Sequence, residues 1–274
     1  AVIALILTVT GLVVAKPLLI YMGTPENILA DAHIYLSTMV CGTLIVTAYN
    51  LSASILRAFG DGKTPLIAMA IAAVLNIILD PIFIFGLNMG VKGAAIATII
   101  AQAIACAMVA RKMMQLPKEY RLSFKDLKCH TDELKHILKV GIPSGLQSMV
   151  VSFSNVIVQG AINGFGAAAL AGWSAYSKLD MILLMPFHSL GIAMTTFTGQ
   201  NIGGGRLDRV SGGVKVTALI NCSWAAATGI LLFVFAEPAL SIFCDEAEIL
   251  EQGVYMLRAM VPFYFLLGLN QVFA

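Results

Sequence analysis

The stretch Ala72–Gly86, AAVLNIILDPIFIFG, is an apolar run with a carboxylate inside it. Asn76 and Asp80 lie four residues apart in this run, and Pro81 follows directly. Residues four apart are neighbours on one helix face, and a proline cannot donate to the carbonyl four residues before it. An aspartate at bilayer depth costs about 2.5 to 3.5 kcal/mol or more, which indicates a functional role. We expect a membrane helix that holds a proton or a small cation.

The composition extends this interpretation to the whole chain. Of its 274 residues, 59% are hydrophobic and only 12% are charged, and the mean hydropathy is +0.88. A soluble domain has about 25% charged residues. The chain is therefore predicted to be an all-α, polytopic membrane protein.

A membrane-spanning helix needs about 20 mostly apolar residues. This rule gives eight segments, which are residues 1–21, 33–58, 64–87, 91–114, 137–163, 167–199, 214–235 and 250–274. The chain begins without a methionine and ends inside an apolar run, so we expect an excerpt of a longer protein. The sixth segment contains Pro186, which predicts a kink or a break there.

Lysines and arginines gather in alternate loops, which places those loops in the cytoplasm. The longest polar stretch, residues 115–135, is predicted to be a cytoplasmic linker between two lobes. The N-terminal lobe comprises residues 1–114 and the C-terminal lobe residues 136–274, with four helices each. Basic runs beside membranes are routine, so no nucleic-acid partner is expected.

An internal repeat supports the two lobes. The offset that sets Pro17 on Pro238 also sets Ile28 on Ile249, and each copy is a helix end, a short acidic outer loop and a helix return. An even number of helices separates the copies. The lobes are therefore expected to be pseudo-symmetric repeats that run parallel in the membrane.

A tight turn near Gly90 joins the third and fourth segments into an antiparallel hairpin. At about 1.5 Å per residue, Asp80 comes level with Thr98, and Asn76 comes level with Gln102. Hydrogen bonding between helices, worth about 0.6 kcal/mol per contact, is one interpretation of Thr98 and Gln102. A cation-binding site is the other, and for Asp80 it is the favoured one.

The second lobe has polar residues of its own. Lys178 and Asp180 are two residues apart, so they point to different helix faces and cannot simply neutralise each other. Each needs a partner on another helix or a water-filled cavity. Gln147, Asn155 and Gln159 form a stripe on the fifth segment, which is either the wall of a substrate cavity or a set of interhelical hydrogen bonds.

The five cysteines show no metal-ligand spacing. Cys129, His130 and His136 in the polar loop fall short of a closed tetrahedral set. We predict no cofactor and no metal other than a sodium ion at Asp80. His188 is expected to be a packed, hydrogen-bonded side chain.

Five motifs resemble the multidrug and toxic compound extrusion (MATE) family of transporters. They are LRAFGDGKTP at Leu56–Pro65, LNIILDPIFIFG at Leu75–Gly86, GVKGAAIATIIAQ at Gly90–Gln102, VGIPSGLQ at Val140–Gln147 and TGQNIGGG at Thr198–Gly205. Their order and spacing agree with the family over nearly the whole chain. The eight segments resemble the third to the tenth of the family's twelve helices.

This resemblance implies two six-helix lobes around a central cavity that opens alternately to either side of a prokaryotic inner or plasma membrane. It implies a monomer that exports amphipathic or cationic drugs against inward proton or sodium flow. One prokaryotic branch carries an Asn, an Asp and a Thr as part of its cation site, which match Asn76, Asp80 and Thr98. That branch adds an aspartate from the first helix, which this chain does not contain.

Other functions remain open at this point. A lipid-linked oligosaccharide flippase of the same superfamily would be favoured by a strongly cationic cavity, but Lys178 is the one buried cation expected. A membrane scaffold without transport is a further alternative. An integral membrane enzyme would need a nucleophile, a metal cluster or paired acids at one membrane face, and no such set appears in the sequence.

Overall fold

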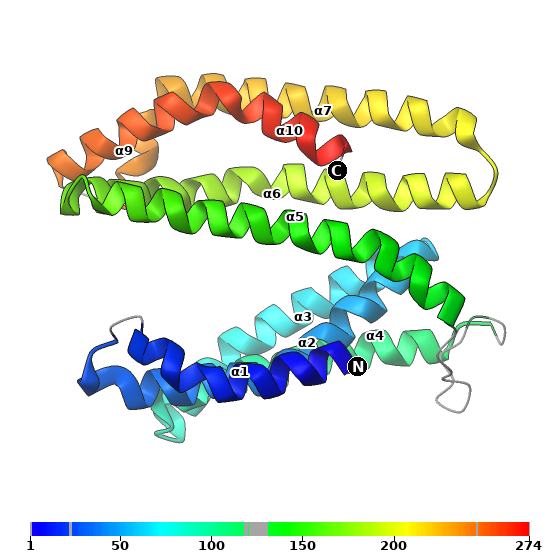
Figure 1. The fold of residues 1–274 in the computed structure, drawn as a ribbon, viewed down its shortest axis with the longest axis horizontal. Helices are drawn as coiled ribbons and strands as arrows, with labels where there is room; N and C mark the ends of the chain where they lie inside the picture. Colours follow the sequence, from blue (N-terminus) through cyan, green and yellow to red (C-terminus); the bar gives the residue numbers. More distant parts are fainter. Residues whose placement is uncertain (1, 22–23, 118–119, 121–130, 245, 274) are drawn as a thin grey trace. The chain divides into compact units, whose positions relative to one another are not determined.

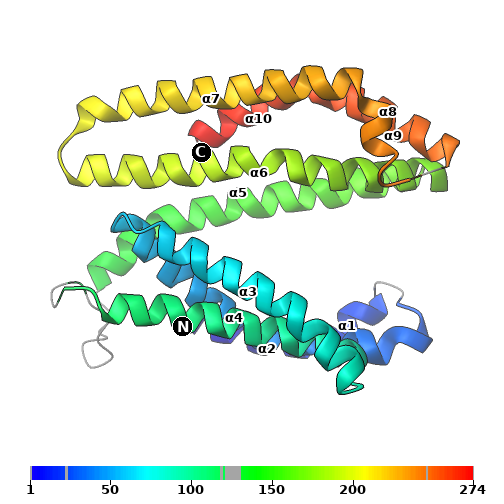
Figure 2. The same cartoon turned by 180° about the vertical axis from the view of Figure 1, so that it is seen from behind.

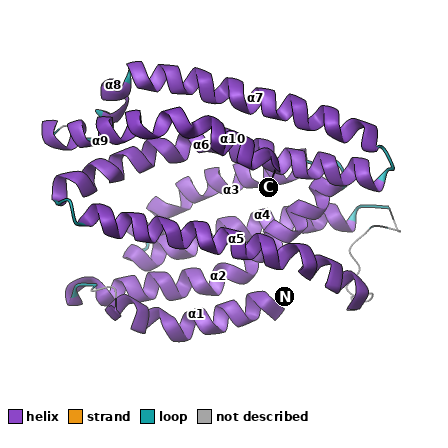
Figure 3. Ribbon diagram, turned by 45° about the horizontal axis from the view of Figure 1, so that its top comes forward, coloured by secondary structure: helices purple, strands orange, loops and turns teal. Residues whose placement is uncertain are grey.

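The computed structural model describes residues 2–21, 24–117, 120, 131–244 and 246–273, and this part of the chain is helical without any strand (Figures 1 and 3). Eight helical segments in it are long and apolar enough to cross a membrane. Each of them overlaps one of the eight predicted segments, so the all-α prediction is confirmed.

The chain divides into two compact units, residues 1–127 and 128–274. The described helices of the first unit are α1 (Val2–Tyr21), α2 (Glu26–Ala58), α3 (Lys63–Pro81), the π-helix η1 (Ile82–Gly86) and α4 (Gly90–Met114). Those of the second unit are α5 (Thr131–Asn163), α6 (Ala167–Gly203), α7 (Leu207–Val234), α8 (Ala236–Leu240), α9 (Ala247–Met260), the 3₁₀-helix η2 (Val261–Phe263) and α10 (Tyr264–Phe273). Most of the predicted linker lies outside the described residues, so its role stays a prediction.

Small side chains hold the first unit together. Helix α2 packs against α1 and α4, and α4 also packs against α3 (Figure 2). Alanines dominate the buried cluster, which contains Tyr49, Ala53, Leu56, Ala68, Ala72, Ala101, Ala105, Val109 and Met113. Small residues let helix backbones approach closely, which is how helices associate where apolar burial gives little advantage. The buried Tyr49 hydroxyl donates to the Pro65 carbonyl at 3.0 Å and fastens α2 to the start of α3.

Larger side chains fill the second unit. Its buried cluster includes Tyr176, Phe187, Leu232, Leu240, Leu257 and Tyr264, contributed by α6, α7, α8, α9 and α10. The fully buried Asn221 of α7 donates from Nδ2 to the Gly268 carbonyl of α10 at 2.9 Å. By contrast, no residue of α5 is buried. The core of this unit is therefore built by the helices that follow α5.

Most helices extend beyond the predicted spans. Helix α2 begins at Glu26 and α7 at Leu207, each several residues before the predicted start. Hydropathy detects only the apolar part of a helix, and polar turns continue the same backbone hydrogen bonding outside it. The start of α2 at Glu26 and that of α9 at Ala247 are related by the offset that sets Pro17 on Pro238.

Of the kink or break predicted at Pro186, the break is wrong, because α6 runs without interruption from Ala167 to Gly203, and the kink stays a prediction. The last segment is interrupted instead, at η2, which contains Pro262 and separates α9 from α10. A proline removes one backbone donor in either place, and the packing around it decides whether the helix continues.

Candidate functional site

Pro81 ends α3 and changes the helix behind it. The turn that follows Pro81 is the wider π-helix η1, in which the Leu87 N–H donates to the Ile82 carbonyl at 2.9 Å. Asn88 and Gly90 then adopt positive φ angles of 51° and 55°, which the chain needs to reverse into α4. The predicted antiparallel hairpin is confirmed.

Gly93 brings the two arms of this hairpin together. A Cβ atom at this position would lie 2.9 Å from the carbonyl carbon and oxygen of Phe83 in η1. No side chain fits there without moving a backbone. Gly93 therefore fixes the close approach of η1 and α4 that sets the positions of the polar residues further along both arms.

Three of the predicted cation-site residues meet across this hairpin. The Asn76 amide nitrogen donates to Asp80 Oδ1 at 3.1 Å and to Thr98 Oγ1 at 3.3 Å. The Thr98 hydroxyl donates to the Ala94 carbonyl at 3.0 Å, so it accepts the Asn76 hydrogen. All three side chains are half-buried.

This arrangement leaves oxygen ligands available. Within the described residues, Asp80 Oδ2 and Asn76 Oδ1 receive no hydrogen bond, and Thr98 Oγ1 keeps a lone pair. Carboxylate, amide and hydroxyl oxygens suit a hard cation, and the carboxylate also suits a proton. The cluster can therefore hold either coupling ion that the sequence suggests.

Gln102 is placed differently from the prediction. Its Nε2 lies 4.0 Å from the Met69 sulfur, and its buried Oε1 has no partner in the described structure. The predicted levels assumed α-helical rise on both arms, but η1 advances less per residue than an α-helix. Asn76 is therefore nearer to the outer turn than predicted, and it meets Thr98 rather than Gln102.

The second unit contains a polar cavity of about 790 Å³ between α5, α6, α9 and α10. Three predicted substrate-cavity residues line it: Asn155, Gln159 and Asp180. Gln147 and Lys178 are not among its lining residues, and both are exposed. His188 also lines the cavity, and its Nδ1 lies 3.1 Å from Gln271 Nε2.

Asp180 is bound by two tyrosines that the sequence analysis did not identify. Tyr176 and Tyr264 both donate their hydroxyls to Asp180 Oδ1, at 3.2 and 2.5 Å. Tyr176 precedes Asp180 by four residues, a spacing that was available as a signal. Tyr264 comes from α10, and nothing in its local sequence points to Asp180.

Lys178 forms no ion pair with Asp180 in the described part of the chain. The two residues point to different faces of α6, as their spacing predicted. Asp180 therefore has both of the environments expected for a charge in a membrane helix. It has hydrogen-bond partners on α6 and α10, and it lines a polar cavity.

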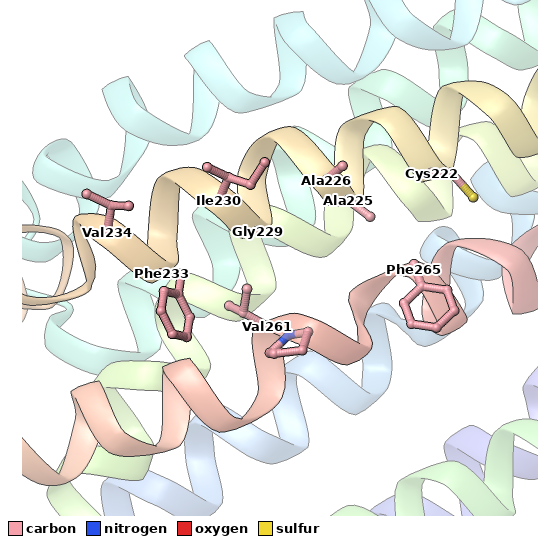
Figure 4. Close-up of a pocket in the computed structure, with 10 residues that line it drawn as sticks. Cys222, Ala225, Ala226, Gly229, Ile230, Phe233, Val234, Val261 and Phe265 are labelled. Atoms are coloured by element: carbon pink, nitrogen blue, oxygen red, sulfur yellow. The ribbon is translucent and has the colours of Figure 1, made fainter.

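A second pocket, of about 410 Å³, is apolar and lies between α7 and the segment from Val261 to Phe265 (Figure 4). Phe233, Val261 and Phe265 face it, and Cys222 is its one thiol (Figure 4). It offers no oxygen ligands comparable with those around Asp80 and Asp180. This pocket therefore lacks the ligands that an ion site requires.

The eight candidate membrane spans of the described residues, with hydrogen-bonded carboxylates inside them, define a multi-pass helical membrane protein. A family model described as MatE matches residues 1–82 and 143–274. The chain belongs to this family, MATE, which is a family of transporters and not of enzymes. The resemblance seen in the sequence motifs is thereby confirmed.

The chain is similar to two proteins of Bacillus subtilis (strain 168). It is 33% identical over 272 residues to "Probable multidrug resistance protein YpnP", covering 96% of this chain and 58% of that protein. It is 29% identical over 274 residues to "Probable multidrug resistance protein YoeA", covering 97% of this chain and 59% of that protein.

A solved structure agrees with the fold as well. The "Crystal structure of MATE in the bent conformation" superposes with a TM-score of 0.90 at 25% sequence identity, over 99% of this chain and 60% of that one. The chain thus spans less than two thirds of the length of the relatives that it matches.

Proposed function

We propose that the complete protein is a secondary active antiporter. It exports organic cations or other amphipathic drugs in exchange for protons or sodium ions, by alternating access. The observation that carries the proposal is the cluster of Asn76, Asp80 and Thr98 inside membrane helices, in which Asp80 Oδ2 and Asn76 Oδ1 have no donor among the described residues and Thr98 Oγ1 keeps a lone pair. The names of the relatives, which describe multidrug resistance proteins, support the substrate class.

The coupling ion acts at Asp80. A proton or a sodium ion neutralises the carboxylate and uses Asn76 Oδ1 and the remaining lone pair of Thr98 Oγ1 as hydrogen-bond partners or ligands. Pro81 and η1 lie directly behind this carboxylate, where the regular helix has already been interrupted. Ion binding therefore changes the conformation of the helix where it is already interrupted. The drug is released outward, either because ion and drug cannot be bound at the same time or because the helix bends near Pro81.

Gln147, Asn155, Gln159, Lys178 and Asp180 are proposed to contribute to drug binding in the second lobe. Three of them support this role by lining one cavity with aromatic side chains, among them Trp173 and Phe187. Carboxylate, amide and aromatic groups together suit amphipathic cations.

The same cavity argues against a flippase for lipid-linked oligosaccharides. A pyrophosphate head group would require Lys or Arg side chains, and no lysine or arginine is among the lining residues of the cavity. Asp180 is the acidic group that lines it. An anionic substrate is therefore disfavoured in comparison with a cationic drug.

The test is drug efflux by the full-length protein in vesicles, with pH and sodium gradients imposed separately. Asp80→Asn keeps the size of the side chain but removes its charge, so we expect efflux to lose its dependence on the coupling ion. Asp208→Asn, on an exposed carboxylate that pairs with Arg206, is the matched control and should leave efflux unchanged. Efflux by Asp80→Asn with an intact ion dependence contradicts the proposal.

A further inference from the structure

The apolar pocket beside α7 is a groove on the surface of the second unit, because several of its lining side chains are exposed, among them Ile230, Phe233 and Phe265 (Figure 4). A contiguous exposed apolar surface marks a place where something binds. We propose that this groove binds an acyl chain of an anionic phospholipid whose phosphate is held by Arg258. This inference goes beyond the proposed function, because it concerns neither a drug nor the cluster at Asp80.

Arg258 of α9 lies at one end of the groove. Its Cζ atom is 5.7 Å from the centroid of the Phe233 ring, and this ring is part of the groove wall. Its Nε donates to the Phe233 carbonyl at 3.3 Å, which holds the side chain against the last turn of α7. The cation and the apolar groove are therefore parts of one continuous surface.

The remaining donors of Arg258 suit a phosphate. A guanidinium has N–H groups on Nε and on both terminal nitrogens, and the Phe233 carbonyl takes the one on Nε. No carboxylate in the described part of the chain forms an ion pair with Arg258. A planar guanidinium stacked on an aromatic ring can bind a phosphate with two parallel hydrogen bonds.

The position of Arg258 along α7 agrees with the depth of lipid phosphates. The sequence from Val216 to Ala236 contains no charged residue. From Lys215 to Phe233 the helix advances about 27 Å, and the hydrocarbon core of a bilayer is about 30 Å thick. Phe233 and Arg258 are therefore expected at the boundary opposite Lys215. The loop beside Lys215 is predicted to be cytoplasmic, so the leaflet is expected to be the outer one.

The groove has the length of one leaflet. Its lining residues on α7 extend from Cys222 to Val234, which is about 18 Å along the helix. Half of the hydrocarbon core is about 15 Å. An acyl chain whose phosphate is bound at Arg258 therefore reaches Cys222 near the middle of the membrane.

The internal repeat favours a lipid over a further helix as the occupant. The offset that relates the start of α2 to that of α9 also relates the groove to a face of α1 and α2. The corresponding residues are Leu5, Val9, Leu12, Val13, Cys41 and Leu44. All of them are exposed, although α3 and α4 follow α2 in the first unit.

The second unit gives the complementary observation. Helices α5 and α6 precede α7 there, and the groove is exposed beside them. By the repeat, helices before and after the pair therefore leave this face open to lipid. Ser37 is at the position that corresponds to Arg258, so the cation is a feature of the second unit.

Native mass spectrometry of the full-length protein in detergent tests the site with two added lipids that share their acyl chains, phosphatidylglycerol and diacylglycerol. Arg258→Gln should bind phosphatidylglycerol about tenfold more weakly than the wild type, which equals about 1.4 kcal/mol, and should bind diacylglycerol equally. Arg209→Gln, at an exposed arginine near the other end of α7, is the matched control and should bind both lipids like the wild type. Equal binding of phosphatidylglycerol by Arg258→Gln and the wild type overturns the proposal.

Ala226→Phe tests the groove itself. Ala226 is exposed and lines the groove, so a phenyl ring there occupies the space of the acyl chain without disturbing the core. Binding of both lipids should become weaker. Ala227 is also exposed but is not among the lining residues, so Ala227→Phe is the matched control and should bind both lipids like the wild type.

Unchanged lipid binding in Ala226→Phe overturns the proposal, because the phosphate would then bind at Arg258 without a chain in the groove. Neither lipid measurement involves efflux or its ion dependence. The failure of this inference is therefore distinguishable from the failure of the proposed function, which efflux by Asp80→Asn decides.

Discussion

Gly93→Ala should move α3 and α4 apart and weaken the hydrogen bonds among Asn76, Asp80 and Thr98. The added Cβ atom would lie 2.9 Å from the carbonyl carbon and oxygen of Phe83 and 3.0 Å from the Met89 Cβ. Ordinary contact begins at 3.4 Å, and the nearest atoms are backbone atoms that cannot rotate away. The two arms must therefore separate by about half an ångström.

The expected loss of stability follows from two opposing terms. Overpacking a well-packed contact costs about 1 to 3 kcal/mol, and replacing glycine by alanine inside a helix returns up to about 1 kcal/mol. The difference between the two terms is a net destabilisation of about 0 to 3 kcal/mol, centred on about 1.5 kcal/mol. The separation also lengthens the bond from Asn76 to Thr98, which is already 3.3 Å long and at the outer limit for such bonds.

Thermal unfolding of the purified full-length protein in detergent measures the loss of stability. The ion dependence of drug efflux measures the weakening of the cluster at Asp80. Gly86→Ala is a matched control in the same hairpin, because its Cβ atom would meet only Ile82 Cγ2, at 4.0 Å. Gly93→Ala should unfold at a lower temperature than Gly86→Ala and show weaker ion dependence. Equal behaviour of the two variants would refute the reasoning.

Three further predictions concern the ends and the packing of the helices. Hydrogen bonds from the Thr64 hydroxyl at 2.6 Å and from its backbone N–H at 2.9 Å hold the pKa of the Asp61 carboxyl, in the loop before α3, below its ordinary value of 3.8. A group whose pKa is lowered by folding stabilises the protein above its ordinary pKa and loses that effect as the pH falls. Asp61→Asn should therefore cost about 1 kcal/mol of stability near neutral pH. Thermal unfolding measured as a function of pH should show a smaller loss of stability on the acid side for this variant. Tyr49→Phe removes the hydroxyl that donates to the Pro65 carbonyl and should destabilise the protein by about 0.6 to 1 kcal/mol. Unfolding in detergent measures this loss, and an unchanged unfolding temperature would show that this bond does not hold α2 to α3. Arg258 donates from Nε to a carbonyl in the last turn of α7 at 3.3 Å, so Arg258→Gln should cost about 0.3 to 1 kcal/mol and speed amide hydrogen exchange in that turn, with exchange in α2 as the internal reference.

The spans were predictable because hydropathy depends on local composition. The ends of the helices were not, since polar turns at Glu26 and Leu207 belong to the helices but not to the apolar runs. The effects of Pro186 and Pro262 on their helices were not predictable from local composition either. Pro186 lies inside an intact helix and Pro262 lies in an interruption, and only the packing of neighbouring helices distinguishes them.

The cation cluster was predictable in part. Asn76 and Asp80 share a face by their spacing, and Thr98 follows from the hairpin. Gln102 was misplaced because the sequence does not reveal that η1 changes the rise per residue. Tyr264 was missed because it lies 84 residues from Asp180 along the chain, and a contact of that range depends on how α6 and α10 pack.

The π-helix η1 also determines where this chain can change its length during evolution. A π-helical turn is an α-helix with one residue inserted, so a deletion within Ile82–Gly86 restores regular pitch and leaves the helices on both sides in register. A deletion between Asp80 and the start of α3 would rotate part of that helix by about 100° and carry side chains away from Thr98. Relatives that differ in length by one residue in this hairpin should therefore have the gap inside η1, with the spacing of Asn76 and Asp80 unchanged.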